Sequence, residues 1–167
     1  GRRLVFYPGS SIGNFDPPAA LALLRRMRSL LATDGALLIG VDLVKDTAVL
    51  EAAYDDAAGV TAAFNLNVLK HLNRLLDADF DLAQWRHRAL FNREKSRIEM
   101  RLEALADTLV TWPGGSRHFR RGEHIHTENS YKYRIADFAG LLEHAGFANR
   151  SCWTDPGHGF AVLLARP

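Results

Sequence analysis

Apolar residues along this chain gather in short continuous runs separated by amphipathic stretches. Residues 3–7 and 36–41 are such runs, and the second has the pattern of a parallel strand covered on both faces. Between them, residues 17–31 place apolar side chains at helical spacing and predict an amphipathic helix. The order strand, helix, strand indicates an α/β fold with a right-handed crossover.

Beyond residue 45 the pattern first stays helical and then becomes alternating. Helices are predicted, from apolar residues at helical spacing, at residues 47–58, 60–76 and 135–144. Strands are predicted, from alternating or continuous apolar positions, at residues 85–91, 97–105, 109–112, 149–154 and 160–165. Residues 97–102 alternate most regularly. We expect the middle strands to form an antiparallel insertion set on the parallel sheet.

A glycine-rich turn follows the first predicted strand directly. Gly9 and Gly13 place Asn14 in a loop at the carboxyl end of that strand, where open α/β sheets bind ligands. Asp16 then provides a helix N-cap, with proline in the first turn. The segment is either a binding crevice or a turn whose glycines serve backbone geometry alone. Because the chain begins at Gly1 within a strand and has no G-x-G-x-x-G loop, we expect it to be the C-terminal half of a larger α/β enzyme.

Composition narrows the class of protein. The chain has 167 residues, 47% of them hydrophobic, and 21 basic against 19 acidic side chains. This length supports one domain with a real core, and the small net charge of +2 predicts no nucleic-acid partner. No run approaches the roughly 20 apolar residues of a membrane span, so no membrane partner is expected.

The single cysteine, Cys152, argues against a disulfide framework and fits a reducing, cytoplasmic compartment. Its neighbours Ser151 and Trp153 suggest a strand, in which we expect Cys152 to be a buried core thiol rather than a nucleophile.

Polar residues gather in four segments where burial would otherwise be expected, at residues 9–14, 42–46, 53–60 and 127–133. His124 and His126 precede the last of these and could begin a metal site. No third ligand stands at a motif spacing, so we expect a solvated histidine pair and no metal.

Six short motifs occur in order along the chain: GSSIGNF, DLVKD, YDDAAGVTAAFN-N-L, DFDL, RIEM and TENS-K-R. Together they resemble the histidine-specific, S-adenosylmethionine-dependent methyltransferases, which make the trimethylated histidine betaine of ergothioneine biosynthesis. The resemblance covers nearly the whole chain. It implies the C-terminal half of a class I (Rossmann-like) methyltransferase sheet with an α+β substrate-binding insertion. Core segments would span residues 1–48 and 134–167, with the substrate-recognition insertion at residues 49–133.

The resemblance implies that Asn14 and Tyr54 hold the substrate carboxylate through neutral donors. Gly9 would let the backbone approach the substrate amine. Without the family context, the pattern around Tyr54 favours a core-facing helical tyrosine with its hydroxyl at the surface.

The resemblance also implies that Glu128 and Ser130 grip the imidazole ring of histidine, since a spacing of two on an extended segment directs both to one side. Met100 would add an apolar wall. Without the family context, Glu128 and Ser130 could be a capping or turn cluster, and Met100 could belong to the core.

The implied reaction is methyl transfer from S-adenosylmethionine to the α-amine of L-histidine, which demands orientation more than acid–base chemistry. We therefore expect no catalytic acid or base, and we expect the main cofactor-binding loops upstream of this chain. Alternatives are a methyltransferase of the same fold for another amino acid or amine, or a non-catalytic amino-acid-binding fragment. An apolar edge at residues 4–7 and an uncovered sheet face further predict that this fragment self-associates.

Overall fold

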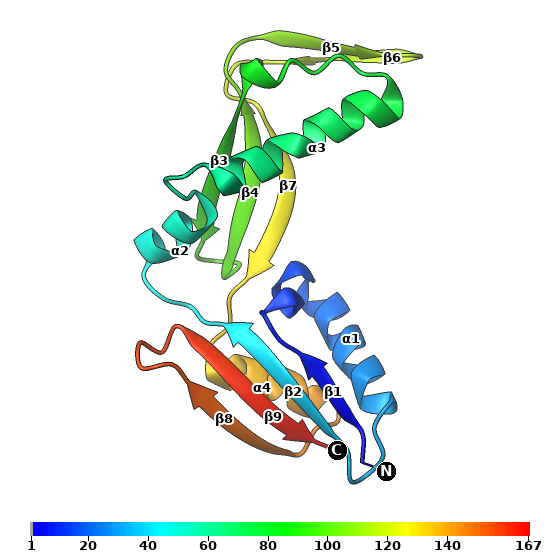
Figure 1. The fold of residues 1–167 in the computed structure, drawn as a ribbon, viewed down its shortest axis with the longest axis vertical. Coiled ribbons are helices and arrows are strands. Elements are labelled where there is room, and N and C mark those ends of the chain that lie inside the picture. Colours follow the sequence, from blue (N-terminus) through cyan, green and yellow to red (C-terminus); the bar gives the residue numbers. More distant parts are fainter. Residues whose placement is uncertain (1) are drawn as a thin grey trace. The chain divides into compact units, whose positions relative to one another are not determined.

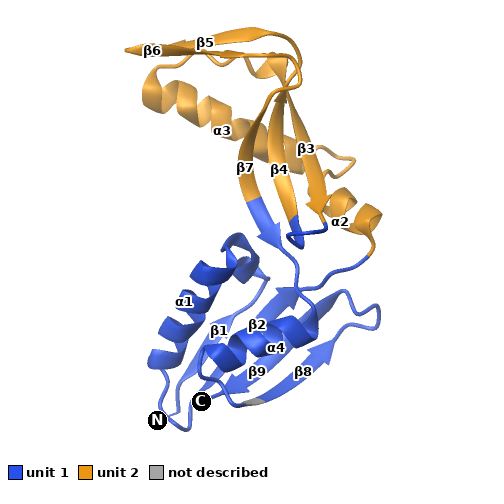
Figure 2. Ribbon diagram, turned by 180° about the vertical axis from the view of Figure 1, so that it is seen from behind, with its two compact units in different colours: residues 1–45, 93–97, 129–167 blue, residues 46–92, 98–128 orange. Residues whose placement is uncertain are grey.

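The computed structural model describes residues 2–167, apart from the side chain of Asn149, and divides the chain into two compact units. Unit 1 comprises residues 1–45, 93–97 and 129–167, and unit 2 comprises residues 46–92 and 98–128 (Figure 2).

Unit 1 is built on a four-stranded sheet (Figure 1). Its order is β1 (Leu4–Tyr7), β2 (Ala36–Asp42), β9 (Phe160–Arg166) and β8 (Asn149–Thr154). β1 runs parallel to β2, whereas β9 runs antiparallel to both β2 and β8. The predicted strand–helix–strand unit is therefore present, with a terminal antiparallel pair completing the sheet.

Two helices, α1 (Pro17–Ser29) and α4 (Ile135–His144), cover one face of this sheet (Figures 1 and 2). Their fully buried side chains, among them Leu24 and Phe138, pack in one core with Ile39 of β2 and Leu163 of β9. The helix ends agree with the sequence signals, since the Asp16 carboxylate accepts a hydrogen bond of 2.8 Å from the backbone N–H of Ala19.

The opposite face of the sheet carries exposed apolar side chains. Leu4 and Phe6 alternate with the inward-facing Val5 and Tyr7 on β1, and they are 59% and 63% exposed. β1 pairs with β2 alone among the described strands, so its other edge is open.

Unit 2 combines helices with two antiparallel assemblies. The helices are α2 (Thr47–Tyr54) and α3 (Val60–Leu76). A three-stranded sheet has the order β3 (Trp85–Asn92), β4 (Arg97–Ala104), β7 (His124–Tyr131), and a hairpin joins β5 (Thr108–Trp112) to β6 (Gly115–Phe119). Short 3-10 turns occur at Ser11–Asn14 (η1) in unit 1 and Leu82–Gln84 (η2) in unit 2. Leu69 of α3 packs in one core with Trp85, Leu102 and Phe119.

The predicted helix over residues 47–58 is shorter than expected and ends at Tyr54. Asp55 leaves the helical region, and the carboxylate of Asp56 accepts hydrogen bonds from the backbone N–H groups of Val60 and Thr61. These bonds hold the pKa of Asp56 at about 2. Asp56 thus binds the first two backbone N–H groups of α3, which begins at Val60, because a short acidic side chain competes for backbone donors.

The prediction that Cys152 is a buried core thiol is wrong, because the residue is exposed. It lies on β8, an edge strand of the four-stranded sheet. The flanking residues correctly indicated a strand, but burial depends on how far the covering helices reach across the sheet. Partial desolvation still raises the pKa of the Cys152 thiol above its ordinary value.

Candidate functional site

In unit 1, the loop after β1 is fixed by contacts with the ends of two other strands. Ser10, at a φ of 59°, accepts a hydrogen bond of 2.8 Å on its hydroxyl oxygen from the backbone N–H of Asp42 in β2. A Cβ placed on Gly13 would lie 2.7 Å from the carbonyl oxygen of Tyr131 and 3.6 Å from Oγ of Ser130, both in β7. The loop therefore lies against the last residues of β7, which belong to unit 1, as closely as a glycine allows.

Three residues of unit 1 that were predicted to bind the substrate lie on or beside this loop. Gly9 has a φ of +74°, and a Cβ built on it meets no described atom within 4 Å. Asn14 is the exposed last residue of η1. Ser130 is buried at 6% exposure in β7, beside the loop. Gly9, Asn14 and Ser130 are thus on or next to one loop at the carboxyl end of β1, where the sequence predicted a ligand site.

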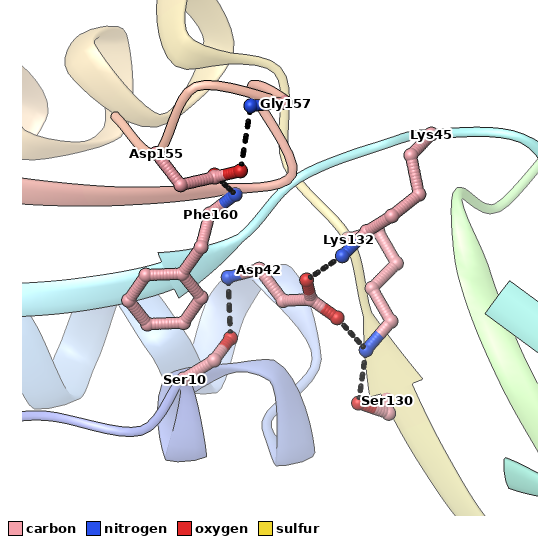
Figure 3. A network of polar contacts seen from close by, with 8 residues as sticks. All are labelled: Ser10, Asp42, Lys45, Ser130, Lys132, Asp155, Gly157 and Phe160. Carbon is pink, nitrogen blue, oxygen red and sulfur yellow. Dashed lines mark hydrogen bonds and ion pairs between the residues drawn. The ribbon is translucent and has the colours of Figure 1, made fainter. Parts of the chain in front are cut away.

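Ser130 contacts a network of two lysines and an aspartate (Figure 3). The Lys132 ammonium donates to Ser130 Oγ at 2.9 Å and pairs with Oδ2 of Asp42 at 2.9 Å. The Lys45 ammonium pairs with the other Asp42 oxygen at 2.6 Å. From the sequence, Asp42 and Lys132 belong to the polar segments at residues 42–46 and 127–133, and no pattern there predicts that they pair.

In unit 2, a hydrogen bond to its backbone carbonyl fixes the position of Tyr54. The Tyr54 carbonyl lies at the end of α2 and accepts a hydrogen bond of 2.7 Å from Nε2 of His87 in β3. Nδ1 of His87 in turn lies 2.9 Å from the amide nitrogen of Asn65 in α3. Since a carbonyl only accepts and an amide NH₂ only donates, this geometry assigns His87 as the neutral tautomer protonated at Nε2.

Tyr54 and Met100 lie in the same apolar cluster, together with Leu50, Ala89 and Ile98. Met100 is 3% exposed, and its carbonyl accepts a hydrogen bond of 3.0 Å from the Thr127 hydroxyl of β7. Met100 is therefore a core residue, as the alternative without the family context had it.

Glu128 is half-buried in β7, and the extended conformation expected around it is present. The regular alternation predicted for residues 97–102 is broken by Glu99, which is 3% exposed in β4 and pairs with Arg101 and Asn92. Sequence reasoning missed Glu99, Asn65 and His87, because each occupies a position whose neighbours do not mark it as buried.

His124 and His126 are both exposed. Within residues 2–167, no group of three or more His, Cys, Asp or Glu side chains lies close enough to hold a metal ion. Nor does any helix of the described part combine the length and apolar character needed to cross a membrane.

Solved structures with similar folds are very different in sequence. The PH0226 protein from Pyrococcus horikoshii is 8% identical and superimposes with a TM-score of 0.51 over 98% of this chain and 54% of its own. The CcbJ methyltransferase from Streptomyces caelestis is 13% identical, with a TM-score of 0.49 over 98% of this chain and 59% of its own. The fold is mixed α/β with a partial Rossmann-like sheet, as the sequence predicted.

The sequence comparison identifies the family. The profile of the histidine-specific, S-adenosylmethionine-dependent methyltransferases matches residues 1–167, and the chain belongs to that family. It is 45% identical over 167 residues to the histidine N-alpha-methyltransferase of Mycolicibacterium smegmatis and 41% identical to that of Mycobacterium tuberculosis, covering 99% of this chain and 52% of each relative. Ergothioneine biosynthesis protein 1 of Neurospora crassa is 30% identical over 168 residues, which are 19% of its length. The family expected from the six motifs is thereby confirmed, and the chain spans about half the length of the histidine methyltransferases it matches.

Proposed function

We propose that the protein containing this chain transfers methyl groups from S-adenosylmethionine to the α-amino group of L-histidine, in an ergothioneine-type pathway in the cytoplasm. The observation that carries the proposal is the family match over the whole chain, together with 45% identity to a histidine N-alpha-methyltransferase.

Asn14 and Tyr54 are proposed to bind the substrate carboxylate, and the Gly9 backbone to approach the α-amine. An amide and a phenol bind a carboxylate without placing a full positive charge beside the amine that must react. Asn14 is exposed at the end of the η1 turn, and the backbone of Tyr54 is fixed by His87.

Glu128 and Ser130 are proposed to recognise the imidazole, with Met100 contributing an apolar surface. An ionised Glu128 accepts from a ring N–H, and the Ser130 hydroxyl serves the other nitrogen. An aliphatic side chain offers neither group a ring nitrogen, so these two contacts favour imidazole.

The residues of this chain bind and orient the substrate, and no side chain is assigned as catalytic acid or base. A reference α-amine has a pKa of about 8, so a useful fraction is neutral near neutral pH. The remaining requirement is alignment of the amine nitrogen, which is catalysis by proximity and orientation.

S-adenosylmethionine supplies the transferable methyl group when bound. The carboxyl ends of β1 and β2 fit the edge at which such sheets bind ligands. The Asp42 carboxylate at this edge is already engaged by Lys45 and Lys132, so we do not assign it to the cofactor. The main cofactor loops are proposed to lie upstream, and residues 49–133 to form the substrate-recognition insertion between core segments 1–48 and 134–167.

Methyl transfer by the full-length protein tests this function directly. L-Histidine should accept methyl groups from labelled S-adenosylmethionine, whereas histamine and L-leucine should be poor substrates. Glu128→Ala should weaken histidine binding by about 1.5–3 kcal/mol, the scale of a charged hydrogen bond, with cofactor binding unchanged. Equal turnover of an unrelated amino acid would favour the alternative of another methyltransferase of the same fold.

The isolated 167-residue chain is proposed to lack activity and to self-associate through β1 or the uncovered sheet face. The open edge of β1 and the exposed Leu4 and Phe6 support this. Phe6→Lys is a better probe than a change at Val5, because Val5 packs against the core. Light scattering should show an assembly that Phe6→Lys weakens, and a monomeric wild-type chain would contradict the proposal.

A further inference from the structure

The Lys132 ammonium is buried in unit 1, where a charge is costly unless it is paired. Its side chain is 1% exposed, and it lies 2.9 Å from Asp42 Oδ2 and 2.9 Å from Ser130 Oγ (Figure 3). Removing an ammonium from water costs several kcal/mol, which a partner carboxylate and hydrogen bonds must offset. A buried ion pair does not by itself show that the pair stabilises the fold. The contact between Lys132 and Ser130, a residue proposed to bind the substrate, points instead to a role in the binding site.

Asp42 is held in place from several sides. Its backbone N–H donates to Ser10 Oγ at 2.8 Å, and its carbonyl accepts from the Tyr133 backbone N–H at 3.0 Å. The Lys45 ammonium occupies Oδ1 of its carboxylate. Asp42 therefore connects the loop after β1 to the segment after β7, and it fixes the position from which Lys132 reaches Ser130.

The direction of the hydrogen bond between Lys132 and Ser130 is set by chemistry. A lysine ammonium has three donors and no acceptor, so the Ser130 oxygen accepts from it. The O–H bond of Ser130 is thereby directed away from the ammonium. The adjacent positive charge also polarises this hydroxyl and makes it a stronger donor.

We propose that Lys132 is a positioning residue that makes Ser130 a hydrogen-bond donor to an unprotonated ring nitrogen of the substrate imidazole. The inference rests on the proposed function and deepens it, because it states that Ser130 donates, rather than accepts, the hydrogen bond to the imidazole. Ser130 then favours a ring that has an unprotonated nitrogen, and a neutral imidazole has one.

A double-mutant cycle on the full-length protein tests this coupling. L-Histidine affinity is measured by calorimetry, with S-adenosylhomocysteine present to prevent turnover, for wild type, Lys132→Met, Ser130→Ala and the double variant. Each single change should weaken binding about tenfold, the loss of one polar contact. The double variant should also lose only about tenfold, because both changes remove the same interaction.

Lys45→Met is the matched control, because Lys45 is more exposed than Lys132 and pairs with Oδ1 of the same aspartate, whereas Lys132 pairs with Oδ2 and contacts Ser130. It should keep histidine affinity within about twofold of wild type. An additive loss of about a hundredfold in the double variant, or a tenfold loss in Lys45→Met, would overturn the inference. If Lys132→Met does not fold, as judged by thermal unfolding, Lys132→Gln is measured instead. Because its amide can still donate to Ser130 Oγ, it should lose less histidine affinity than Ser130→Ala, and a larger loss would overturn the inference. A wild-type protein that does not bind histidine would instead refute the proposed function.

Discussion

The backbone of Gly13 lies so close to Tyr131 that a Cβ on the glycine would stand 2.7 Å from the tyrosine carbonyl oxygen. Both atoms that would collide belong to the main chain or are fixed to it, so neither can rotate away. This contact holds the loop of residues 9–14 against β7, where Ser130 lies.

Gly13→Ala should therefore displace the loop. We expect a loss of about 1–3 kcal/mol in the free energy of unfolding, the scale of overpacking, together with weaker histidine binding. Urea denaturation and calorimetry measure the two effects. Gly140→Ala is the control, since a Cβ there meets no described atom within 4 Å and lies inside α4. It should stabilise the protein by roughly 0.5–1 kcal/mol, and equal effects of the two variants would contradict the steric argument.

The contacts of His87 predict a loss of stability when its ring is replaced by an apolar one. His87→Phe leaves the Tyr54 carbonyl and the Asn65 amide without their ring partners. The expected cost is about 1–3 kcal/mol for each buried group that stays unsatisfied, measured by thermal or urea unfolding.

His87→Gln provides the control, because its amide can donate to one partner and accept from the other. It should recover part of the lost stability. A variant as unstable as His87→Phe would show that ring packing, rather than the two hydrogen bonds, gives His87 its role.

The proposed carboxylate contacts predict a difference between two ligands. Asn14→Ala and Tyr54→Phe should each weaken the binding of L-histidine to the full-length protein by about 0.5–1.5 kcal/mol, the net value of a hydrogen bond. Both should have far less effect on histamine, which lacks the carboxylate. Calorimetry with the two ligands separates recognition from pocket shape, since an equal loss for both would assign these residues to shape alone.

Glu103 predicts a pH-dependent contribution to stability in unit 2. Hydrogen bonds from Arg86 and Arg88 lower the pKa of its carboxyl from 4.5 to about 2. A lowered pKa in the folded state stabilises the protein above the unfolded pKa, and this contribution disappears as the pH falls from about 4.5 toward 2. Glu103→Gln should lower the free energy of unfolding at pH 7 by at most about 1 kcal/mol, because the pair is near the surface.

Urea unfolding at pH 7 and at pH 3 should show the difference between wild type and Glu103→Gln shrinking as the pH falls. Glu94→Gln, at an exposed residue in the turn between β3 and β4, is the control and should show no such trend. A difference that grows toward low pH would have the wrong sign for this ion pair.

Cys152 is exposed, but partial desolvation raises the pKa of its thiol. Because the thiolate is the nucleophile, alkylation by iodoacetamide should be slower at pH 7.5 than that of glutathione, and should accelerate as the pH rises beyond about 8.5. Peptide mass spectrometry follows the reaction at this residue. Alkylation at pH 7.5 faster than that of glutathione would indicate a lowered pKa and contradict the prediction. Cys152→Ser should leave methyl transfer unchanged.

Local patterns in the sequence determined most of the secondary structure. The predicted helices at residues 60–76 and 135–144 coincide with α3 and α4, because apolar spacing at 3.6 residues per turn is a local property. The helix N-cap at Asp16 was predicted for the same reason, since capping involves neighbours along the chain. The order of six motifs was enough to indicate the family that the whole-chain profile match establishes.

Tertiary structure alone decided which polar side chains are buried and what they contact. Lys132 stands between two tyrosines in a polar segment, and nothing nearby in the sequence marks it as the partner of Asp42. Cys152 became exposed because its strand is at the sheet edge, and Glu99 became buried despite regular alternation around it. A periodic pattern states which positions share a face, but burial and charge pairing depend on which distant segment covers that face. The sequence alone therefore predicted a ligand site at the loop of residues 9–14, and the fold added the lysine and aspartate that contact Ser130 beside this loop.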